Sequence, residues 1–283
     1  MPTLPDALSP GSEAALSAWA ARVRANRDQA ERMREPAPPS DFYAPVASSF
    51  RADPRRTDEP VLNHLRTLVR PGETWLDIGA GGGRYSLALA LEAKEVIAVE
   101  PSNGMRAVLR QAMAEEGIGN ITIHETEWPT SALTVHADVA FISHVGYDIE
   151  AIGPFLDQME MSARRMCVAV LLAEAPATPA SLFWPGVHGE SRELLPALPE
   201  FLALQLARGP LCEVALFERP AATYASREAL VVGMRQQLFV APGSEKDQRL
   251  HDMIDKIAVQ DEAGRLSLGW HAAPLGVVSW RPG

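Results

Sequence analysis

The chain has 283 residues, of which 47% are hydrophobic, enough to bury one α/β core with additions or two smaller domains. Its 26 Lys and Arg against 36 Asp and Glu give a formal net charge of −10, which argues against a duplex or tRNA substrate. Membrane helices need roughly 20 consecutive apolar residues, and no such run is present. The first residues also lack a signal-peptide pattern, so we expect a soluble cytoplasmic protein.

The N-terminal part separates into a helix and a connector. Residues 10–34 have the pattern of a charged helix with one apolar side, which we expect to pack across the body of the protein or a partner. Residues 35–60 are rich in proline, which disfavours regular structure and predicts a semi-rigid connector. We therefore predict an N-terminal helix with its connector over 1–55 and a main domain over 56–283.

The most informative segment is 74–90, where an apolar strand runs into a glycine turn and then into a helix. Glycines in such a turn let the backbone bend sharply and approach a ligand closely, and the helix that follows offers unpaired N–H groups. Asp77 stands two residues before the first glycine, Gly79, and Gly81 follows. A dinucleotide fingerprint needs a glycine at the sixth position, where this chain has Arg84.

A second strand, 95–100, ends in an acid. Glu100 lies 21 residues after Gly79, the spacing at which a carboxylate can bind the two hydroxyls of a ribose. Because nicotinamide-dependent enzymes use such an acid too, Glu100 indicates a nucleoside site without choosing the cofactor. A nicotinamide-dependent oxidoreductase is therefore the alternative, disfavoured by Arg84 and by the position of Asp77.

Two further strands complete the pattern. The strand 120–124 precedes the acidic loop 125–129, and the strand 138–145 carries Ser143 and His144 to the rim where open α/β sheets bind ligands. With the glycine turn, Glu100 and the 101–105 loop, these segments resemble the class I S-adenosylmethionine-dependent methyltransferases of the small-molecule, type 11/12-like branch.

The resemblance implies an α/β, Rossmann-like sheet of seven mostly parallel strands with helices on both faces. Its antiparallel last strand, 276–280, would lie between the fifth strand, 165–172, and the sixth, 212–218. Helices are expected over 58–69 and 193–208.

The implied cofactor is S-adenosyl-L-methionine, with S-adenosyl-L-homocysteine as product. Asp77 would orient the glycine turn and the methionyl ammonium, and Glu100 would bind the ribose. Glu125 or Glu127 would meet the adenine amino group, and the aromatic segment 42–50 would cover the methionine end. The expected cofactor-binding residues are Tyr43, Asp77, Gly79, Ala80, Gly81, Glu100, Pro101, Met105, Glu125, Thr126, Glu127, Trp128, Ser143 and His144.

Two insertions interrupt this plan. The loop 182–189 follows the fifth strand, and the segment 223–270 predicts two helices, 226–239 and 244–260, of the kind that often form a lid over a small substrate. An imidazole near its ordinary pKa suits a general base if the acceptor is a hydroxyl or a phenol. The candidates, in order, are His144, His188 and His271. An amine, sulfur or carbon acceptor would need no dedicated base.

The remaining predictions concern partners. We expect a small-molecule methyl acceptor, no nucleic acid and no membrane, although Arg51, Arg55 and Arg56 form a basic cluster near the site. Cys167 and Cys212 lack partners at metal-ligand spacing, so we expect neither a disulfide nor a metal. A catalytically inactive, methyltransferase-like binding protein is the alternative from another class. The oligomeric state stays open, a homodimer included.

Overall fold

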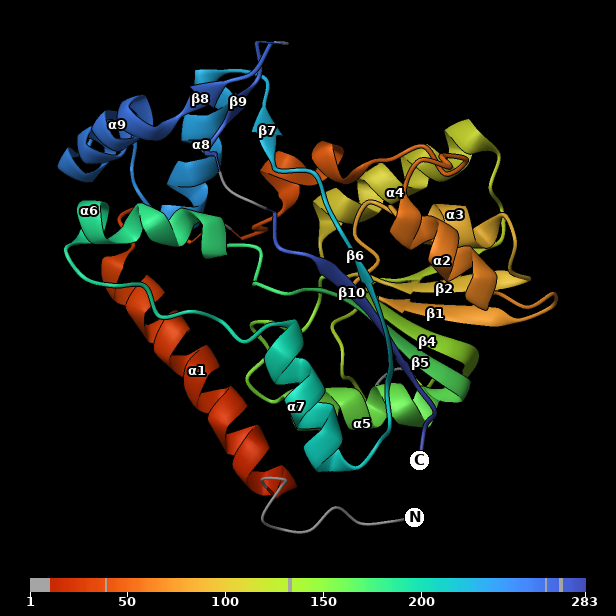
Figure 1. Ribbon diagram of the computed structural model, residues 1–283. Coiled ribbons are helices and arrows are strands. Elements are labelled where there is room, and N and C mark those ends of the chain that lie inside the picture. Colours follow the sequence, from red (N-terminus) through yellow and green to blue (C-terminus); the bar gives the residue numbers. More distant parts are fainter. Residues whose placement is uncertain (1–10, 39, 132–133, 263, 270–271) are drawn as a thin grey trace.

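The computed structural model describes the chain except residues 1–10, 39, 132–133, 263 and 270–271. A seven-stranded sheet of order β3-β2-β1-β4-β5-β10-β6 forms its centre (Figure 1). The first five strands pair in parallel, and β10 is antiparallel to both neighbours. The strands are β1 (Thr74–Ile78), β2 (Glu95–Val99), β3 (Ile121–His124), β4 (Ala137–Ser143), β5 (Ala163–Leu172), β6 (Glu213–Phe217) and β10 (Leu275–Trp280).

This arrangement confirms the predicted fold class, including the antiparallel last strand between the fifth and the sixth. The parallel strands are covered on both faces, which explains why β1 and β4 are almost continuously apolar. Asp77 lies beside Phe141, and Ile78 lies beside Val99. The carboxyl ends of β1, β2 and β4 therefore meet at one edge of the sheet, where the glycine turn and Glu100 follow.

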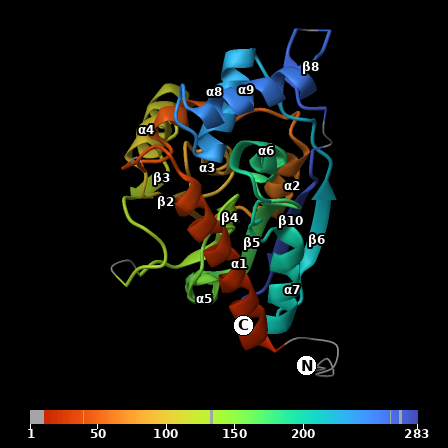
Figure 2. The same ribbon diagram turned by 90° about the vertical axis from the view of Figure 1, so that its left-hand side faces the viewer.

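Helices form a layer on each face of the sheet. α2, α3 and α4 lie on one face, and α5 and α7 lie on the other (Figure 1). α1 crosses α5 and α7 on the outside (Figure 2), where Trp19 Nε1 donates to the Ile149 carbonyl at 2.9 Å. The bounds are α1 (Ser12–Met33), α2 (Pro60–Leu68), α3 (Ser86–Ala90), α4 (Asn103–Glu116), α5 (Ile152–Ser162) and α7 (Leu198–Arg208).

α7 is shorter than the sequence pattern predicts. It begins at Leu198 rather than near residue 193. Side chains of α1 bond the backbone just before it: Arg22 donates to the carbonyls of Leu194 and Leu195, each at 3.4 Å. The segment before α7 therefore follows α1 as extended chain, a tertiary contact that local periodicity does not contain.

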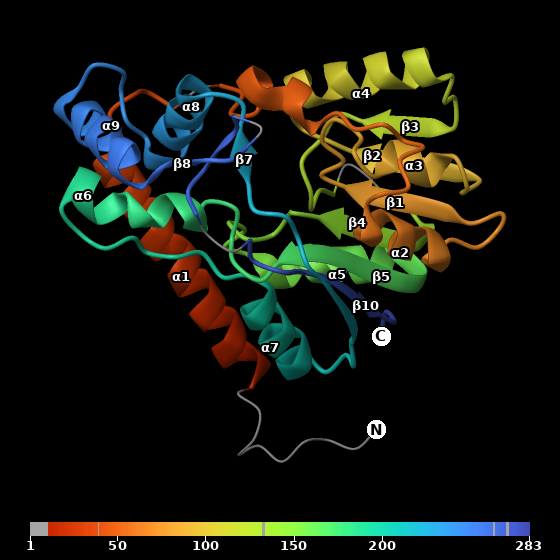
Figure 3. The same ribbon diagram turned by 45° about the horizontal axis from the view of Figure 1, so that its top comes forward.

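The two insertions form one structural unit at the end of the molecule beside the carboxyl edge of the sheet (Figure 3). The predicted loop 182–189 is in fact helical, and it packs against the second insertion. Their shared apolar cluster includes Phe183, Trp184, Leu230 and Leu250. The elements are η2 (Thr178–Leu182), α6 (Trp184–His188), α8 (Arg227–Leu238), α9 (Glu245–Ile257) and a small sheet of β7 (Thr223–Tyr224), β9 (Leu266–Ser267) and β8 (Val259–Gln260).

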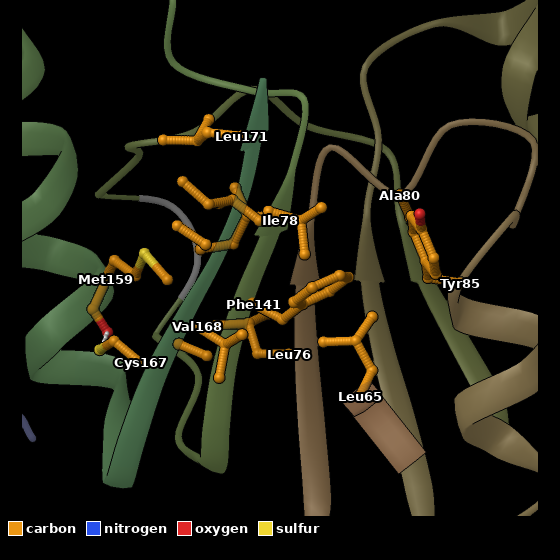
Figure 4. Packing of buried hydrophobic residues seen from close by; sticks show 14 of the residues in the cluster. Leu65, Leu76, Ile78, Ala80, Tyr85, Phe141, Met159, Cys167, Val168 and Leu171 are labelled. Carbon is orange, nitrogen blue, oxygen red and sulfur yellow. Dashed lines mark hydrogen bonds between the residues drawn. The ribbon is translucent and has the colours of Figure 1, made fainter. Parts of the chain in front are cut away.

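The main core lies on both faces of the sheet. Leu65 and Tyr85 lie on one side of the strands, and Met159 and Cys167 lie on the other (Figure 4). Phe141 of β4 is fully buried, with its ring centroid 5.9 Å from that of Tyr85. The packing of Phe141 therefore fixes β4 two residues before Ser143, the residue at which the strand reaches the edge of the sheet.

Three other expectations concern the chain as a whole. Cys167 is buried in β5, Cys212 lies one residue before β6, and both thiols are free. Among the described residues, no helix combines the length and the apolar character that crossing a bilayer requires. The boundary between 1–55 and 56–283 stays a prediction.

Candidate cofactor-binding site and the adjoining cavity

The glycine turn leaves β1 at the centre of the sheet edge. Gly79 N–H donates to the Val99 carbonyl at 2.8 Å, which ties the turn to β2. Gly81 has a φ of +55°, and a Cβ added there would have Met105 Sδ, 3.9 Å away, as its nearest neighbour. Gly81 therefore supplies both a backbone conformation that favours glycine and open space beside the turn.

Glu100 sits under this turn. Its two carboxylate oxygens accept hydrogen bonds from Gly81 N–H and from Ser102 N–H, both at 2.8 Å. The side chain is only 5% exposed, and burial raises the pKa of its carboxyl group. Each oxygen keeps a free lone pair, so the carboxylate can still accept two more hydrogen bonds. The two hydroxyls of a vicinal diol could donate them.

Asp77 is a second buried carboxylate at the same edge. It accepts a hydrogen bond from Ser86 Oγ and is 2% exposed. Burial, together with the neighbouring charge of Glu100, raises the pKa of Asp77 to about 7. Within the described chain neither carboxylate has a Lys or Arg ion pair, so a cationic ligand would stabilise both.

A cavity of about 520 Å³ opens between these carboxylates and the ends of β1, β2 and β4. Its size is that of an ordinary small-molecule site. Asp148 is a further acid on its wall, and the single cation, Arg84, is already paired with Glu59 at 2.9 Å. The predicted residues that line it are Tyr43, Asp77, Gly79, Ala80, Gly81, Glu100, Pro101, Met105, Glu127, Trp128, Ser143 and His144.

The two acids proposed for the adenine amino group lie differently. Glu127 lines the cavity, whereas Glu125 is exposed outside it and forms ion pairs with Arg110 and with Arg106. Thr126 does not line the cavity either. The loop after β3 therefore presents Glu127 and Trp128 to the site.

Ser143 ends β4 and His144 follows it, beside the glycine turn, and both line the cavity. His144 has a φ of +57°, a strained conformation for a residue other than glycine, and its N–H donates to the Val170 carbonyl at 2.9 Å. Ser143 Oγ and His144 Nδ1 are buried, with no hydrogen-bond partner in the described structure. Burial, assisted by the positive charge of Arg219, lowers the pKa of His144 to about 4. At neutral pH the imidazole is therefore uncharged, and it is a weaker base than an ordinary histidine.

The other histidine candidates are not at this site. His188 lies in α6, where it stacks on Trp184 and bonds the Leu238 carbonyl at 2.9 Å through Nε2. It lines neither this cavity nor the adjoining one, so its contacts are those of a packed structural residue. His271 lies outside the described residues.

The aromatic segment 42–50 covers the outer side of the cavity through Tyr43 and Phe50. It includes the 3-10 helix η1 (Ala44–Phe50), which packs on α4. Asp41 fastens it: its carboxylate accepts from Ser102 Oγ at 2.9 Å and from Gly104 N–H at 3.1 Å. The Gly104 hydrogen bond is the main reason that the pKa of Asp41 is lowered.

We expect Asp41→Asn to loosen this cover. Asparagine offers a single oxygen acceptor and an NH2 group in place of two carboxylate oxygens, so bonds to α4 are lost. The dissociation rate of S-adenosylhomocysteine should rise several-fold, on the order of the factor that a net contribution of about 1 kcal/mol gives. Stopped-flow fluorescence measures that rate. Asp53→Asn is the matched control, because Asp53 bonds Arg55 N–H within the same connector; equal rates in the two variants would contradict the role of Asp41.

A second cavity of about 490 Å³ adjoins the first along the sheet edge. It lies between the ends of β5 and β6 and the helical insertion. Leu172 at the end of β5 lines it, and the Leu172 N–H donates at 2.7 Å to the hydroxyl of Tyr147, which follows β4. Tyr147 does not line the first cavity itself but lies between Gly146 and Asp148, which do, so this hydrogen bond ties the wall of the second cavity to the segment that borders the first.

Sequence reasoning missed several of these residues. Phe50 lines the first cavity because η1 folds back on α4, and Arg219 lines the second because the chain after β6 returns to the sheet edge. Position at the carboxyl end of an expected strand could have flagged Arg219. No local signal marks Phe50. Among the described residues, no group of three or more His, Cys, Asp or Glu side chains is placed to hold a metal ion.

Comparisons with known proteins agree with this geometry. The structure of the YcgJ protein from Bacillus subtilis is 14% identical, covers 78% of this chain and 98% of its own, and has a TM-score of 0.54. That of an S-adenosylmethionine-dependent methyltransferase from Geobacter sulfurreducens, in complex with S-adenosyl-L-homocysteine, is 17% identical, covers 89% and 100%, and has a TM-score of 0.51. At these identities the similarity is one of fold.

The fold and the site together define the class I, Rossmann-like methyltransferase architecture. Within it, residues 76–160, from β1 to α5, match a family model described as a methyltransferase domain. The match confirms the resemblance to the class I S-adenosylmethionine-dependent methyltransferases. No curated protein sequence matches the chain at a significant level.

Proposed function

We propose that this protein transfers a methyl group from S-adenosylmethionine to a small-molecule acceptor. The observation that carries the proposal is the pair of buried carboxylates, Asp77 and Glu100, beside an open glycine turn at the carboxyl edge of the sheet. A buried acid without a cationic partner is costly unless a ligand compensates it. S-adenosylmethionine offers an ammonium and a sulfonium for that purpose and a ribose diol for Glu100.

The chain's own residues divide the binding work. Glu100 would accept from the ribose, Asp77 would compensate the methionyl ammonium, and Gly81 would allow close approach of the backbone. Met105, Trp128 and Glu127 line the same cavity; the first two would offer apolar surface to the adenine, and Glu127 would accept from its amino group. The roles of Glu125 and Thr126, and of His188 as base, are left out of the proposal because these residues lie elsewhere.

Bound S-adenosylmethionine supplies an electrophilic methyl group for an in-line displacement, in which alignment and exclusion of water lower the barrier. His144 and Ser143 line the cavity beside the glycine turn. The uncharged imidazole would help to position a hydroxyl acceptor by contact, and its lowered pKa makes it a weak base, so the proposal assigns it no proton transfer. Tyr43 closes the outer side.

The pairing of the arginines near the site supports a small-molecule acceptor rather than a nucleic acid. The basic cluster near the site is neutralised, because Arg51 pairs with Glu115, Arg55 with Glu116, and Arg56 with Glu59. Nucleic-acid binding depends on unpaired cations that contact phosphates. Arginines already bound to glutamates contribute little to such a surface.

Calorimetry of the purified chain against S-adenosylmethionine, S-adenosylhomocysteine and NAD tests the proposal. Micromolar binding of the two sulfur nucleosides without NAD is the expected result. Binding of NAD alone would contradict the proposal and favour the alternative, a nicotinamide-dependent oxidoreductase. Binding of the sulfur nucleosides without turnover of any acceptor would favour the inactive binding protein instead.

The raised pKa of Asp77 predicts a pH dependence of that binding. An ammonium group binds the ionised carboxylate, and with a pKa of about 7 a growing fraction of Asp77 is protonated as the pH falls below 7. The dissociation constant of S-adenosylmethionine should therefore rise by about tenfold in all as the pH falls from 8 to 6, with roughly fivefold of that between pH 7 and 6.

Calorimetry at pH 6, 7 and 8 measures this change, and buffers of different ionisation enthalpy should report proton release on binding at pH 6. Asp77→Asn should bind more weakly at pH 8 and lose most of the dependence. A wild-type affinity that is flat between pH 6 and 8 would contradict the ammonium assignment.

A further inference from the structure

The wall of the second cavity combines apolar and charged side chains. Most of its lining is apolar, contributed by leucine, proline and alanine residues of β5, of the chain after β6 and of the insertion. Among these stand two charged side chains, Glu174 after β5 and Arg219 after β6. A molecule that fills this space would contact apolar surface over most of its body and charge at two points.

Arg219 is an exposed side chain of this cavity wall. Within the described residues it makes no ion pair, hydrogen bond or cation–π contact, whereas Arg227 and Arg235 of the insertion pair with Asp255 and Asp247, each at 2.7 Å. Glu174 likewise has no partner there, and the two charges do not pair with each other. An unpaired guanidinium in a cavity wall is available to an anionic ligand, for which its planar fork is well suited.

The position of Arg219 relates it to the methyl-transfer site. β4 and β5 pair directly, with Ser143 beside Val170, so the residues that end these strands share one rim. The positive charge of Arg219 acts on His144: after burial, it makes the largest contribution to the lowered pKa of the imidazole. The ends of β5 and β6 are level, since both Leu172 and Phe217 lie beside Leu275, so an anion on Arg219 would lie on the same edge of the sheet as His144.

We propose that this second cavity binds the methyl acceptor and that the acceptor is a small molecule with an apolar body and one carboxylate, which pairs with Arg219. The inference rests on the proposed methyl transfer and names its substrate class. A single guanidinium matches a single negative charge. A dianionic phosphate fits less well, because Glu174 lines the same wall and the protein is acidic overall.

The cavity wall also carries hydrogen-bonding groups. Gln237 Oε1 of α8 is buried and has no hydrogen-bond partner in the described structure, and Tyr224 brings a phenol. Burial raises the pKa of Tyr224, so its hydroxyl remains a donor at neutral pH. An unpaired buried acceptor is costly unless a ligand donates to it. The acceptor molecule should therefore carry a hydrogen-bond donor besides its carboxylate.

Matched carboxylate and amide probes test the proposal on the full chain saturated with S-adenosylhomocysteine. The pairs are phenylacetate with phenylacetamide, 4-hydroxybenzoate with 4-hydroxybenzamide, and octanoate with octanamide, with phenyl phosphate as a dianionic arm. Saturation-transfer NMR and competition titration give the affinities. At least one carboxylate should bind tenfold or more tightly than its amide, as a charge-assisted hydrogen bond allows.

Arg219→Gln should abolish that preference, while Arg281→Gln should keep it. Arg281 also lacks an ion pair within the described residues, and it follows β10 at the opposite edge of the sheet. Equal binding of every acid and its amide, or no binding of any carboxylate, would overturn the proposal. A tighter phenyl phosphate would overturn the carboxylate assignment.

Calorimetry with S-adenosylhomocysteine on the same samples distinguishes a failure of the proposed methyl transfer from a failure of the acceptor assignment. If it does not bind, the proposed methyl transfer fails. If it binds normally to the wild type and to Arg219→Gln while the carboxylate preference is absent, only the acceptor assignment fails. Binding that is unchanged by Arg219→Gln, together with a carboxylate preference lost in that variant alone, supports both.

Discussion

Replacing Glu100 with Ala is expected to weaken S-adenosylmethionine binding by at least about tenfold. The carboxylate is nearly buried, and its remaining lone pairs face the cavity. A hydrogen bond to a charged group contributes roughly 1.5–3 kcal/mol, which corresponds to about 10- to 150-fold in the dissociation constant. Glu100→Gln should also bind poorly, because its NH2 group would face Gly81 N–H or Ser102 N–H, where an acceptor is needed.

Glu125→Ala is the matched control for this experiment. Glu125 is an acid of the same predicted site, but its exposed side chain pairs with Arg110 and Arg106 outside the cavity. Calorimetry on both variants should show wild-type affinity for Glu125→Ala and a clear loss for Glu100→Ala. Unchanged affinity in Glu100→Ala, with the fold intact by circular dichroism, would refute the ribose assignment.

Phe141→Ala should cost about 3–5 kcal/mol in the free energy of unfolding, the range observed when a large aromatic is truncated in a packed core. Phe141 is fully buried in β4, and its ring centroid lies 6.0 Å from that of Trp75 and 5.9 Å from that of Tyr85. Because the strand ends at Ser143 and His144, loss of this packing should also weaken cofactor binding in the fraction that stays folded.

Urea unfolding followed by fluorescence or circular dichroism measures the effect. Leu216→Ala is the control: Leu216 lies in β6 of the same sheet but is 63% exposed, so its truncation should change the free energy by about 0.5 kcal/mol or less. Equal losses in the two variants would show that the sheet is not stabilised by the central packing described above.

The sheet was predictable because its signals are local. Apolar runs bounded by turns mark β1, β4 and β5, and alternation with helices indicates a parallel sheet. The position of β10 came from the resemblance, since periodicity cannot order strands. The extended chain before α7 and the helical form of the 182–189 segment were missed because contacts with α1 and with the second insertion decide them.

The cofactor site followed from the same local logic. Asp77, the glycine turn and Glu100 were identifiable because each occupies a set position relative to a strand end. The choice between Glu125 and Glu127 was not, because neighbouring residues of a loop point in different directions once it packs. His188 had a suitable side chain and a suitable place in the chain, but α6 turns it onto Trp184.

By itself the sequence determined the fold class and the edge of the sheet at which Asp77, the glycine turn and Glu100 gather, because strand periodicity, glycine conformation and the spacing of acids are local properties. Only the tertiary structure decided which loop side chains face the cavities, that Asp41 fastens the cover to α4, and that Arg219 stands without a charged partner in the wall of the second cavity. These depend on how segments far apart in the chain pack and on which charges find partners, and no pattern along the sequence encodes that outcome locally.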